Sequence, residues 1–408
     1  MHSQLIFNFQ HRFKIWKIKD KQAHRLLFQD SLIPDSRKTV TDFRFTPEDA
    51  YSRRIAFQAF FPNLISPAPI PVQSAPRFIG DSHFWQTPAA TEQLVAERHS
   101  NRPKVTPSNS CAHTYLGLPW ASYTDKKTVP ASIISVLVER MRGYRALAEF
   151  WKIKWGDDVR VHTVCQHVRW DHLLLLWKML NITDVHLSHC EPFSHSITCN
   201  YGITAHSWML EAVNVVNKDR RVGLSIGKPI SDKKLLAAFV GADMPHYRSH
   251  VRSALQHEAD KAMLSDVLVD IRESWHLHRA VYKEQAAGQK PSIEEMLNER
   301  VDVERYNKIL SDSVFSLCPE GAGPNTLRLW ESLAVGAIPV VIVEDWIWPA
   351  ILGEDVIWEK CVISVRRNEI DNLFDRLRRL RDENAQHLLM MQRYGMAVYK
   401  RFCTSLCF

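Results

Sequence analysis

Residues 313–349 read SVFSLCPEGAGPNTLRLWESLAVGAIPVVIVEDWIWP, in which an apolar run, a short glycine loop and an amphipathic run follow one another directly. The apolar run predicts a buried strand that ends at Pro319, and the loop 320–324 follows it. Asn325 is a residue type that begins helices well, and Gly336 suits the position that ends one. Because the next run, GAIPVVIV, predicts another strand, the stretch is typical of a strand–helix–strand unit in a parallel sheet.

The loop and the start of this helix predict an anion-binding site. Gly321 and Gly323 let a ligand approach the backbone closely, and the free N–H groups of a helix N-terminus favour negative charge. Arg328 in the first turn adds a guanidinium for a diphosphate, and Glu331 on the same face could accept hydrogen bonds from ribose hydroxyls. The loop is not a dinucleotide fingerprint, since Thr326 stands where the third glycine belongs, and no Gly-Lys-Ser/Thr follows to make a P-loop. A tight turn with an Arg–Glu surface pair would give the same spacing.

Alternating apolar runs on both sides of this stretch predict an α/β protein with parallel sheets. Strands are expected at 159–165, 184–187, 234–240, 267–271, 313–318 and 337–343, with a short strand or a linker at 221–226. Helices are expected at 131–151, 170–180, 246–256, 326–335 and 369–402, and a capping box opens a further one at Ser292. The 408 residues divide into an N-terminal domain at 1–228, a C-terminal domain at 229–385 and a final helix at 386–408 that returns to the first domain. Residues 1–130 show no clear pattern.

Two segments resemble the exostosin-like family of glycosyltransferases, of the GT47 type, in its bacterial-type members. One is the run CPEGAGPNTLRLWESLAVGAIPV, and the other is LLAAFVGADMPHYRSHVRSAL further upstream. The close resemblance covers residues 235–256 and 311–349. It implies a GT-B-like fold, in which two Rossmann-like domains enclose a cleft, and an inverting transfer of a sugar from a nucleotide-sugar donor without a metal ion.

The resemblance also implies roles for individual residues. Arg328 would hold the diphosphate and Glu331 the nucleoside, while Arg248 and Arg252 are further candidates for the diphosphate unless they lie on a solvated helix face. The expected nucleotide-sugar site is completed by four residues of the loop and the helix start: Gly321, Gly323, Asn325 and Thr326. Glu320 departs from the family pattern, and a carboxylate beside a diphosphate is unfavourable unless it points away.

An inverting transfer needs a base that takes the proton of the acceptor hydroxyl. The run HTVCQHVRWDHLLLLW places His167 and Asp171 where a strand passes into a helix, the position at which parallel α/β sheets bind ligands. His167 is the first candidate because imidazole titrates near neutral pH, and Asp171 is the second. Asp171 also fits a simple first-turn helix charge. His186, His189 and Cys190 could act as metal ligands, but no further ligand stands at a suitable spacing.

The composition limits the kinds of ligand and metal site that are expected. The formal net charge of +7 suits an anionic ligand or a membrane surface, but no RNA- or DNA-binding motif accompanies it, so nucleic acid is not expected. The 8 cysteines lack zinc-finger spacing, and no two aspartates stand two apart, so neither a metal site nor an Asp-x-Asp motif is expected. Leaving-group charge would then fall on the helix N-terminus and the arginines.

The N-terminus has no signal-peptide pattern, and no run of 18 uncharged apolar residues occurs. A basic, partly aromatic segment at 12–25 allows peripheral contact with an anionic membrane. The expectation is therefore a cytoplasmic enzyme of surface polysaccharide synthesis, without a cofactor, that uses a nucleotide sugar, chiefly a UDP-sugar, and a glycan or lipid-linked acceptor. An epimerase or hydrolase of nucleotide sugars and a non-catalytic binding protein remain alternatives.

Overall fold

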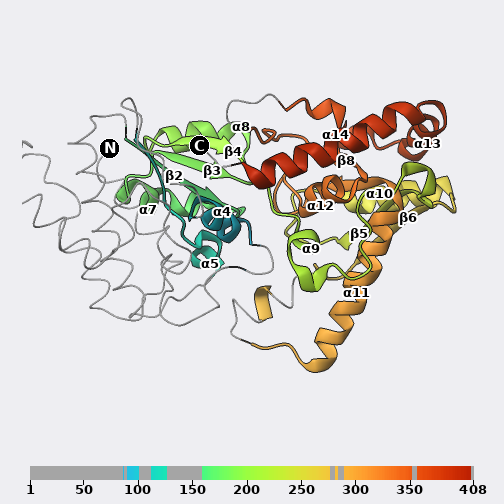
Figure 1. Ribbon diagram of the computed structural model, residues 1–408, viewed down its shortest axis with the longest axis horizontal. Helices are drawn as coiled ribbons and strands as arrows, with labels where there is room; N and C mark the ends of the chain where they lie inside the picture. Colours follow the sequence, from blue (N-terminus) through green and yellow to red (C-terminus); the bar gives the residue numbers. More distant parts are fainter. Residues whose placement is uncertain are drawn as a thin grey trace, which may run out of the picture.

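The protein contains two separate parallel sheets with helices packed around each of them (Figure 1). The computed structural model describes residues 86, 90–100, 112–125, 159–275, 281–283, 289–351 and 356–405. The helix predicted at 131–151 and the basic segment at 12–25 lie outside these residues. No helix in the described part is long and apolar enough to cross a membrane.

The first sheet has four strands in the order β1-β2-β3-β4, all parallel. Its strands are β1 (Ala112–Tyr115), β2 (Val159–Cys165), β3 (Asp184–Leu187) and β4 (Thr204–Ser207). The helices of this half are α4 (Thr91–Ser100), α5 (Trp120–Asp125), α7 (Leu174–Met179), α8 (Pro192–Cys199) and α9 (Val213–Val216). The strands predicted at 159–165 and 184–187 are confirmed.

The second sheet has five parallel strands in the order β6-β5-β7-β8-β9. Its strands are β5 (Leu235–Ala242), β6 (Val267–Arg272), β7 (Ser313–Pro319), β8 (Ile338–Ile342) and β9 (Ile363–Val365). The helices are α10 (Val251–Ala262), α11 (Ile293–Asp312), α12 (Leu327–Val335), α13 (Leu373–Glu383) and α14 (Ala385–Thr404). Ser292 caps α11 through the predicted capping box, and Gly336 ends α12 in the left-handed conformation.

Two local predictions were wrong in detail. The helix expected at 246–256 begins only at Val251, because the preceding residues turn toward the glycine loop and the backbone N–H of Arg248 donates to the carbonyl of Gly321 at 3.1 Å. The helix expected at 170–180 is split into a 3-10 turn at Trp170–Leu173 and α7. The segment 221–226 forms turns, which agrees with the linker that was the alternative to a short strand.

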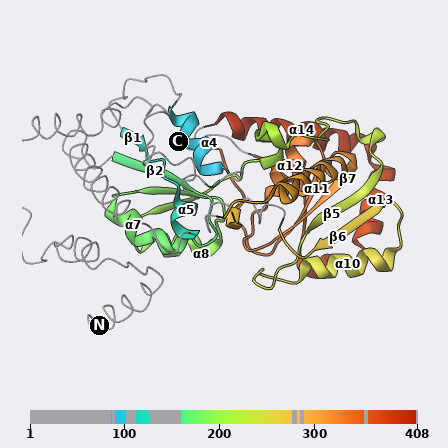
Figure 2. The same ribbon diagram turned by 90° about the horizontal axis from the view of Figure 1, so that it is seen from below.

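A continuous apolar cluster joins the two halves. Trp208, which directly follows β4, packs edge-on against Phe402 of α14 with ring centroids 5.9 Å apart, and Trp330 of α12 contacts the same ring at 5.2 Å. In Figure 2, α14 runs beside α12, and its C-terminal end reaches the first half. The division at residue 228 stays a prediction, but the predicted α/β, GT-B-like architecture of two Rossmann-like sheets is confirmed.

Candidate functional site

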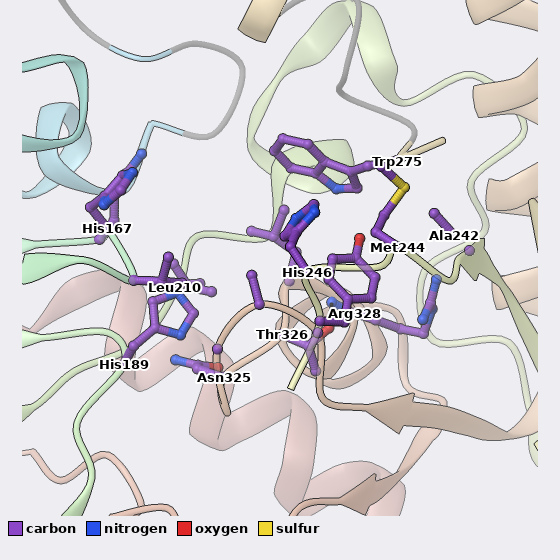
Figure 3. A pocket seen from close by; sticks show the side chains of 18 of the residues that line it. His167, His189, Leu210, Ala242, Met244, His246, Trp275, Asn325, Thr326 and Arg328 are labelled. Atoms are coloured by element: carbon purple, nitrogen blue, oxygen red, sulfur yellow. Dashed lines mark hydrogen bonds between the residues drawn. The ribbon is translucent and has the colours of Figure 1, made fainter. Parts of the chain in front are cut away.

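A cavity of about 410 Å³ lies between the two halves and is lined by residues from both. His167 follows β2 and His189 follows β3, while Gly241 is the next-to-last residue of β5 and Gly321 follows β7. The cavity therefore lies at the carboxyl ends of parallel strands, where open α/β sheets bind ligands. Figure 3 shows His167 and His189 on one side of this pocket, with Arg328 and Trp275 across from them.

The two glycines of the loop make room for side chains of the protein itself. A Cβ at Gly321 would stand 2.9 Å from Nη2 of Arg252, and a Cβ at Gly323 would overlap Nδ1 of His189. Neither glycine has a positive φ, so the backbone conformation alone does not require them. Both glycines line the pocket, as the sequence predicted, and they also bring Arg252 and His189 against the loop.

The start of α12 differs from the prediction at Asn325, which does not cap the helix. Thr326 is the cap, with its hydroxyl accepting from the backbone N–H of Arg328 at 3.4 Å. The amide of Asn325 instead donates to the carbonyls of Ser188 and Trp208, at 2.8 and 3.3 Å, and accepts from the indole of Trp330. The side chain of Asn325 therefore bonds to residues far away in the sequence and connects the loop to the first half. Both Asn325 and Thr326 line the pocket.

Two buried guanidinium groups, those of Arg252 and Arg328, lie in the pocket wall without a carboxylate partner among the described residues. Arg328 stacks on Phe239 at 4.3 Å and donates to the carbonyl of Val240. Burial, together with the charge of Arg328, lowers the pKa of Arg252 to about 10. Two desolvated cations that repel each other favour an anionic ligand, because its charge would compensate both.

Arg252 is held in place by neutral groups. Its Nε donates to the carbonyl of Glu320 at 3.0 Å, Nη1 donates to the carbonyl of Ala242, and the guanidinium lies 4.5 Å from the ring centre of Tyr247. None of these partners neutralises its charge. The group is therefore fixed in position and still available to an anion.

Glu331 is fully buried in the wall behind these arginines. Its carboxyl accepts from the hydroxyl of Tyr306 at 2.6 Å and from the backbone N–H of Asn214 at 3.3 Å. Burial raises its pKa, against the opposing effect of these hydrogen bonds. Each oxygen keeps a second lone pair, so hydrogen bonds from ribose hydroxyls stay chemically compatible with the arrangement.

The structure does not bring Arg248 into the pocket. Its guanidinium forms an ion pair with Glu191, which caps α8 of the first half. Glu320 is buried and is not part of the pocket lining. Its carboxylate accepts from the hydroxyl of Ser249 at 2.6 Å and pairs with Arg367 at 2.5 Å.

Of the two predicted base candidates, only His167 lines the pocket. Its Nε2 lies 2.9 Å from Oδ1 of Asp125, and its Nδ1 accepts from the backbone N–H of Arg169 at 3.0 Å. Asp171 lies exposed on the 3-10 turn and is not part of the pocket wall, which agrees with the simple helix-turn charge that was the alternative. Asp125 was missed because it comes 42 residues before His167, in a part of the sequence without readable periodicity.

His189 lies at the junction of the two halves and is 8% exposed. Its Nδ1 has no hydrogen-bond partner within the part of the chain that the structure describes. Burial lowers the pKa of His189 to about 3, so the ring is neutral near pH 7. His186 lies elsewhere, stacked on His206 at 4.7 Å inside the first sheet. Among the described residues, no three His, Cys, Asp or Glu side chains are arranged to hold a metal ion.

A family profile matches mainly the half of the protein that carries Arg252 and Arg328. Residues 193–380 match the profile of the Exostosin GT47 domain. This part of the chain is therefore similar to an exostosin GT47 domain. The match begins in α8 and includes the whole glycine loop with Arg252, Arg328 and Glu331, whereas Asp125, His167 and His189 precede it.

Curated relatives match over a short segment. The Exostosin-1 homolog of Caenorhabditis elegans is 33% identical over 72 residues, 18% of this chain and 18% of that protein. A "Probable glucuronosyltransferase" of Oryza sativa subsp. japonica is 32% identical over 68 residues, 17% of this chain and 16% of that protein. The match thus spans less than a fifth of the length of these relatives. The crystal structure of the pneumococcal O-GlcNAc transferase GtfA, in complex with UDP and GlcNAc, aligns with a TM-score of 0.32 at 11% identity, over 64% of this chain and 52% of that chain.

Proposed function

We propose that this protein is an inverting glycosyltransferase that moves a sugar from a nucleotide-sugar donor to a glycan or lipid-linked acceptor in surface polysaccharide synthesis. The observation that carries the proposal is the pair of buried guanidinium groups, Arg252 and Arg328, at the glycine loop and the N-terminus of α12. A diphosphate would supply the negative charge that no described carboxylate supplies there. The exostosin GT47 domain supports the same reaction class.

In this proposal the arginines stabilise the diphosphate as it leaves with negative charge, the task that a metal ion performs in many other sugar transferases. The N-terminus of α12 adds backbone N–H groups, and Glu331 holds the nucleoside. The donor class is a UDP-sugar. Because the rice relative is a probable glucuronosyltransferase, UDP-glucuronic acid is the first donor to test. The first half of the protein would bind the acceptor.

Donor binding can be tested by thermal shift on the full chain, with EDTA present and with UDP-, GDP-, CMP- and dTDP-sugars. A ligand at a hundred times its Kd stabilises a protein by about 2.7 kcal/mol, which the melting temperature reports clearly. We expect one nucleotide class to raise the melting temperature of the wild type and not that of Arg328→Ala. Arg393→Ala, at an exposed position of α14, is the matched control and should respond like the wild type.

The reaction products distinguish glycosyl transfer from the alternative activities, which are epimerisation and hydrolysis of the donor. Transfer gives a free nucleoside diphosphate and an extended acceptor with inverted anomeric configuration, which NMR detects. An epimerase would give a changed donor sugar. A hydrolase would give free sugar and a nucleoside diphosphate and would leave the acceptor unextended. An unshifted melting temperature with all donors, or a response of Arg328→Ala equal to that of the wild type, would contradict the proposed donor site.

A further inference from the structure

Asp125, the last residue of α5, lies in the pocket wall that the first half contributes. Its two carboxyl oxygens each accept a hydrogen bond from a side chain. Oδ1 lies 2.9 Å from Nε2 of His167, and Oδ2 accepts from the amide of Gln86 at 2.8 Å. Because a carboxylate offers about four acceptor positions, Asp125 can still accept a further hydrogen bond from a ligand.

The backbone fixes which ring nitrogen of His167 carries the proton. The N–H of Arg169 donates to Nδ1, so Nδ1 must hold a lone pair and a neutral ring carries its proton on Nε2. That proton points at Oδ1 of Asp125. For Nε2 to accept a proton instead, Nδ1–H would have to face the N–H of Arg169, and two donors would then oppose each other. His167 in this arrangement is a donor to Asp125 and offers no lone pair to a substrate.

A second chain of hydrogen bonds reaches Asp125 from the other side. The backbone N–H of Glu92 donates to the amide oxygen of Gln166 at 3.2 Å. The amide nitrogen of Gln166 then donates to the oxygen of Gln86 at 2.7 Å, which leaves the nitrogen of Gln86 to donate to Asp125. Both chains start at a backbone N–H, so their direction is set by the fold, and both end at the same carboxylate.

From this convergence we infer that Asp125, and not His167, is the catalytic base that takes the proton of the acceptor hydroxyl. The inference rests on the proposed function. In the transfer, the O–H bond of the acceptor breaks and its proton goes to Asp125, while the acceptor oxygen forms a bond to C1 of the donor sugar. The bond from C1 to the diphosphate oxygen breaks, and the electron pair leaves with the nucleoside diphosphate beside Arg252 and Arg328. His167 is a positioning residue that holds Asp125.

Two conservative variants distinguish the two assignments. Asp125→Asn keeps the shape and an acceptor oxygen but cannot take up a proton. His167→Gln keeps an N–H donor near the position of Nε2 but cannot act as an imidazole base. The experiment measures the release of nucleoside diphosphate from the donor. The donor is UDP-glucuronic acid or the nucleotide sugar that stabilises the full chain most, and the acceptors are water and a panel of oligosaccharides. Donor Kd is measured in parallel.

We expect Asp125→Asn to lower kcat by about 10²–10⁴-fold with an unchanged donor Kd, the usual contribution of general base catalysis. His167→Gln should keep kcat within about tenfold of the wild type, whereas His167→Ala should lose more, because it removes the hydrogen bond that His167 donates to Oδ1 of Asp125. Should Asp125→Asn not fold, Asp125→Ala with added formate replaces it, and formate should restore turnover to Asp125→Ala but not to His167→Ala.

A kcat of Asp125→Asn close to that of the wild type, or a larger loss in His167→Gln than in Asp125→Asn, would overturn the assignment of the base. Restoration of His167→Ala by imidazole together with failure of formate on Asp125→Ala would do the same. If the wild type bound no nucleotide sugar at all, the proposed function itself would fall. Donor binding therefore separates the two failures.

Discussion

Gly323 lies directly against the imidazole of His189, so closely that Nδ1 occupies the space in which a Cβ would stand. The contact joins the loop after β7 to the residue that follows β3 by two positions, and so it connects the pocket wall that carries the arginines with the opposite wall. Nδ1 faces Gly323 and has no hydrogen-bond partner among the described residues. A neutral ring with its proton on Nε2 suits this position best, since a buried N–H without an acceptor would be costly.

Gly323→Ala should therefore push the His189 ring aside and lower stability by about 1–3 kcal/mol, the usual cost of overpacking. The double variant Gly323→Ala/His189→Ala removes the overlap. Its stability should therefore be close to that of His189→Ala alone. A double-mutant cycle of unfolding free energies measures the coupling between Gly323 and His189. Strictly additive effects would show that the two residues do not meet in solution.

The glycine loop and α12 could be predicted from the sequence because the signal is local. The strand, the glycines, Arg328 and Gly336 follow one another within 24 residues, and each position has its own preference. Asn325 was misjudged for the opposite reason, since its partner Ser188 lies 137 residues away. The preference for an N-cap gave way to a tertiary contact that no local pattern reveals.

Asp125 shows the same limit at the candidate site. The contact between Asp125 and His167 depends on how α5 packs beside the end of β2, and that packing is set by the pairing of β1 with β2. Residues 1–130 gave no readable periodicity, so neither the strand nor the helix was expected there. The sequence predicted His167 as a candidate base on this wall, but it could not show which ring nitrogen of His167 carries the proton.

Arg252 and Arg248 form a matched pair, because they stand four residues apart but only Arg252 lines the pocket. Arg252→Lys should weaken donor binding by about tenfold or more, since a lysine cannot keep the hydrogen bonds to the carbonyls of Ala242 and Glu320 while it also contacts a phosphate. Arg248→Lys should change the donor Kd less than about threefold, because it can keep its ion pair with Glu191. Isothermal titration with the donor measures both, and equal losses would place Arg248 in the donor site after all.

Asn325 should prove more important for stability than its size indicates. Asn325→Ala leaves the carbonyls of Ser188 and Trp208 and the indole N–H of Trp330 without their partner, at a cost of about 1–3 kcal/mol. Asn325→Asp should be less stable still near pH 7, because it turns a carboxylate oxygen toward two carbonyl oxygens. Thermal unfolding of the full chain compares the two. A stability of Asn325→Asp equal to that of the wild type would contradict the orientation of this amide.

Glu92 should make the stability of the wild type depend on pH. The side chain is 2% exposed, and burial raises its pKa to about 8, with the charge of Asp125 acting in the same direction. In the unfolded chain a glutamate titrates near pH ~4.3. Between these two values the folded protein holds one proton more than the unfolded chain, so this contribution to stability is complete below pH ~4.3 and is lost as the pH rises toward 8.

Glu92→Gln removes this titration and keeps a carbonyl oxygen for the backbone N–H groups of Ala121 and Gln166. As the pH rises from about 5 to about 8, the stability of the variant relative to the wild type should therefore increase, by at most about 1.4 kcal/mol per pH unit. Melting curves at several pH values measure the difference, and Glu97→Gln on the same helix controls for the loss of a carboxylate from α4. A difference that stays constant across this range, or that shifts in favour of the wild type, would mean that Glu92 is ionised in the folded protein throughout.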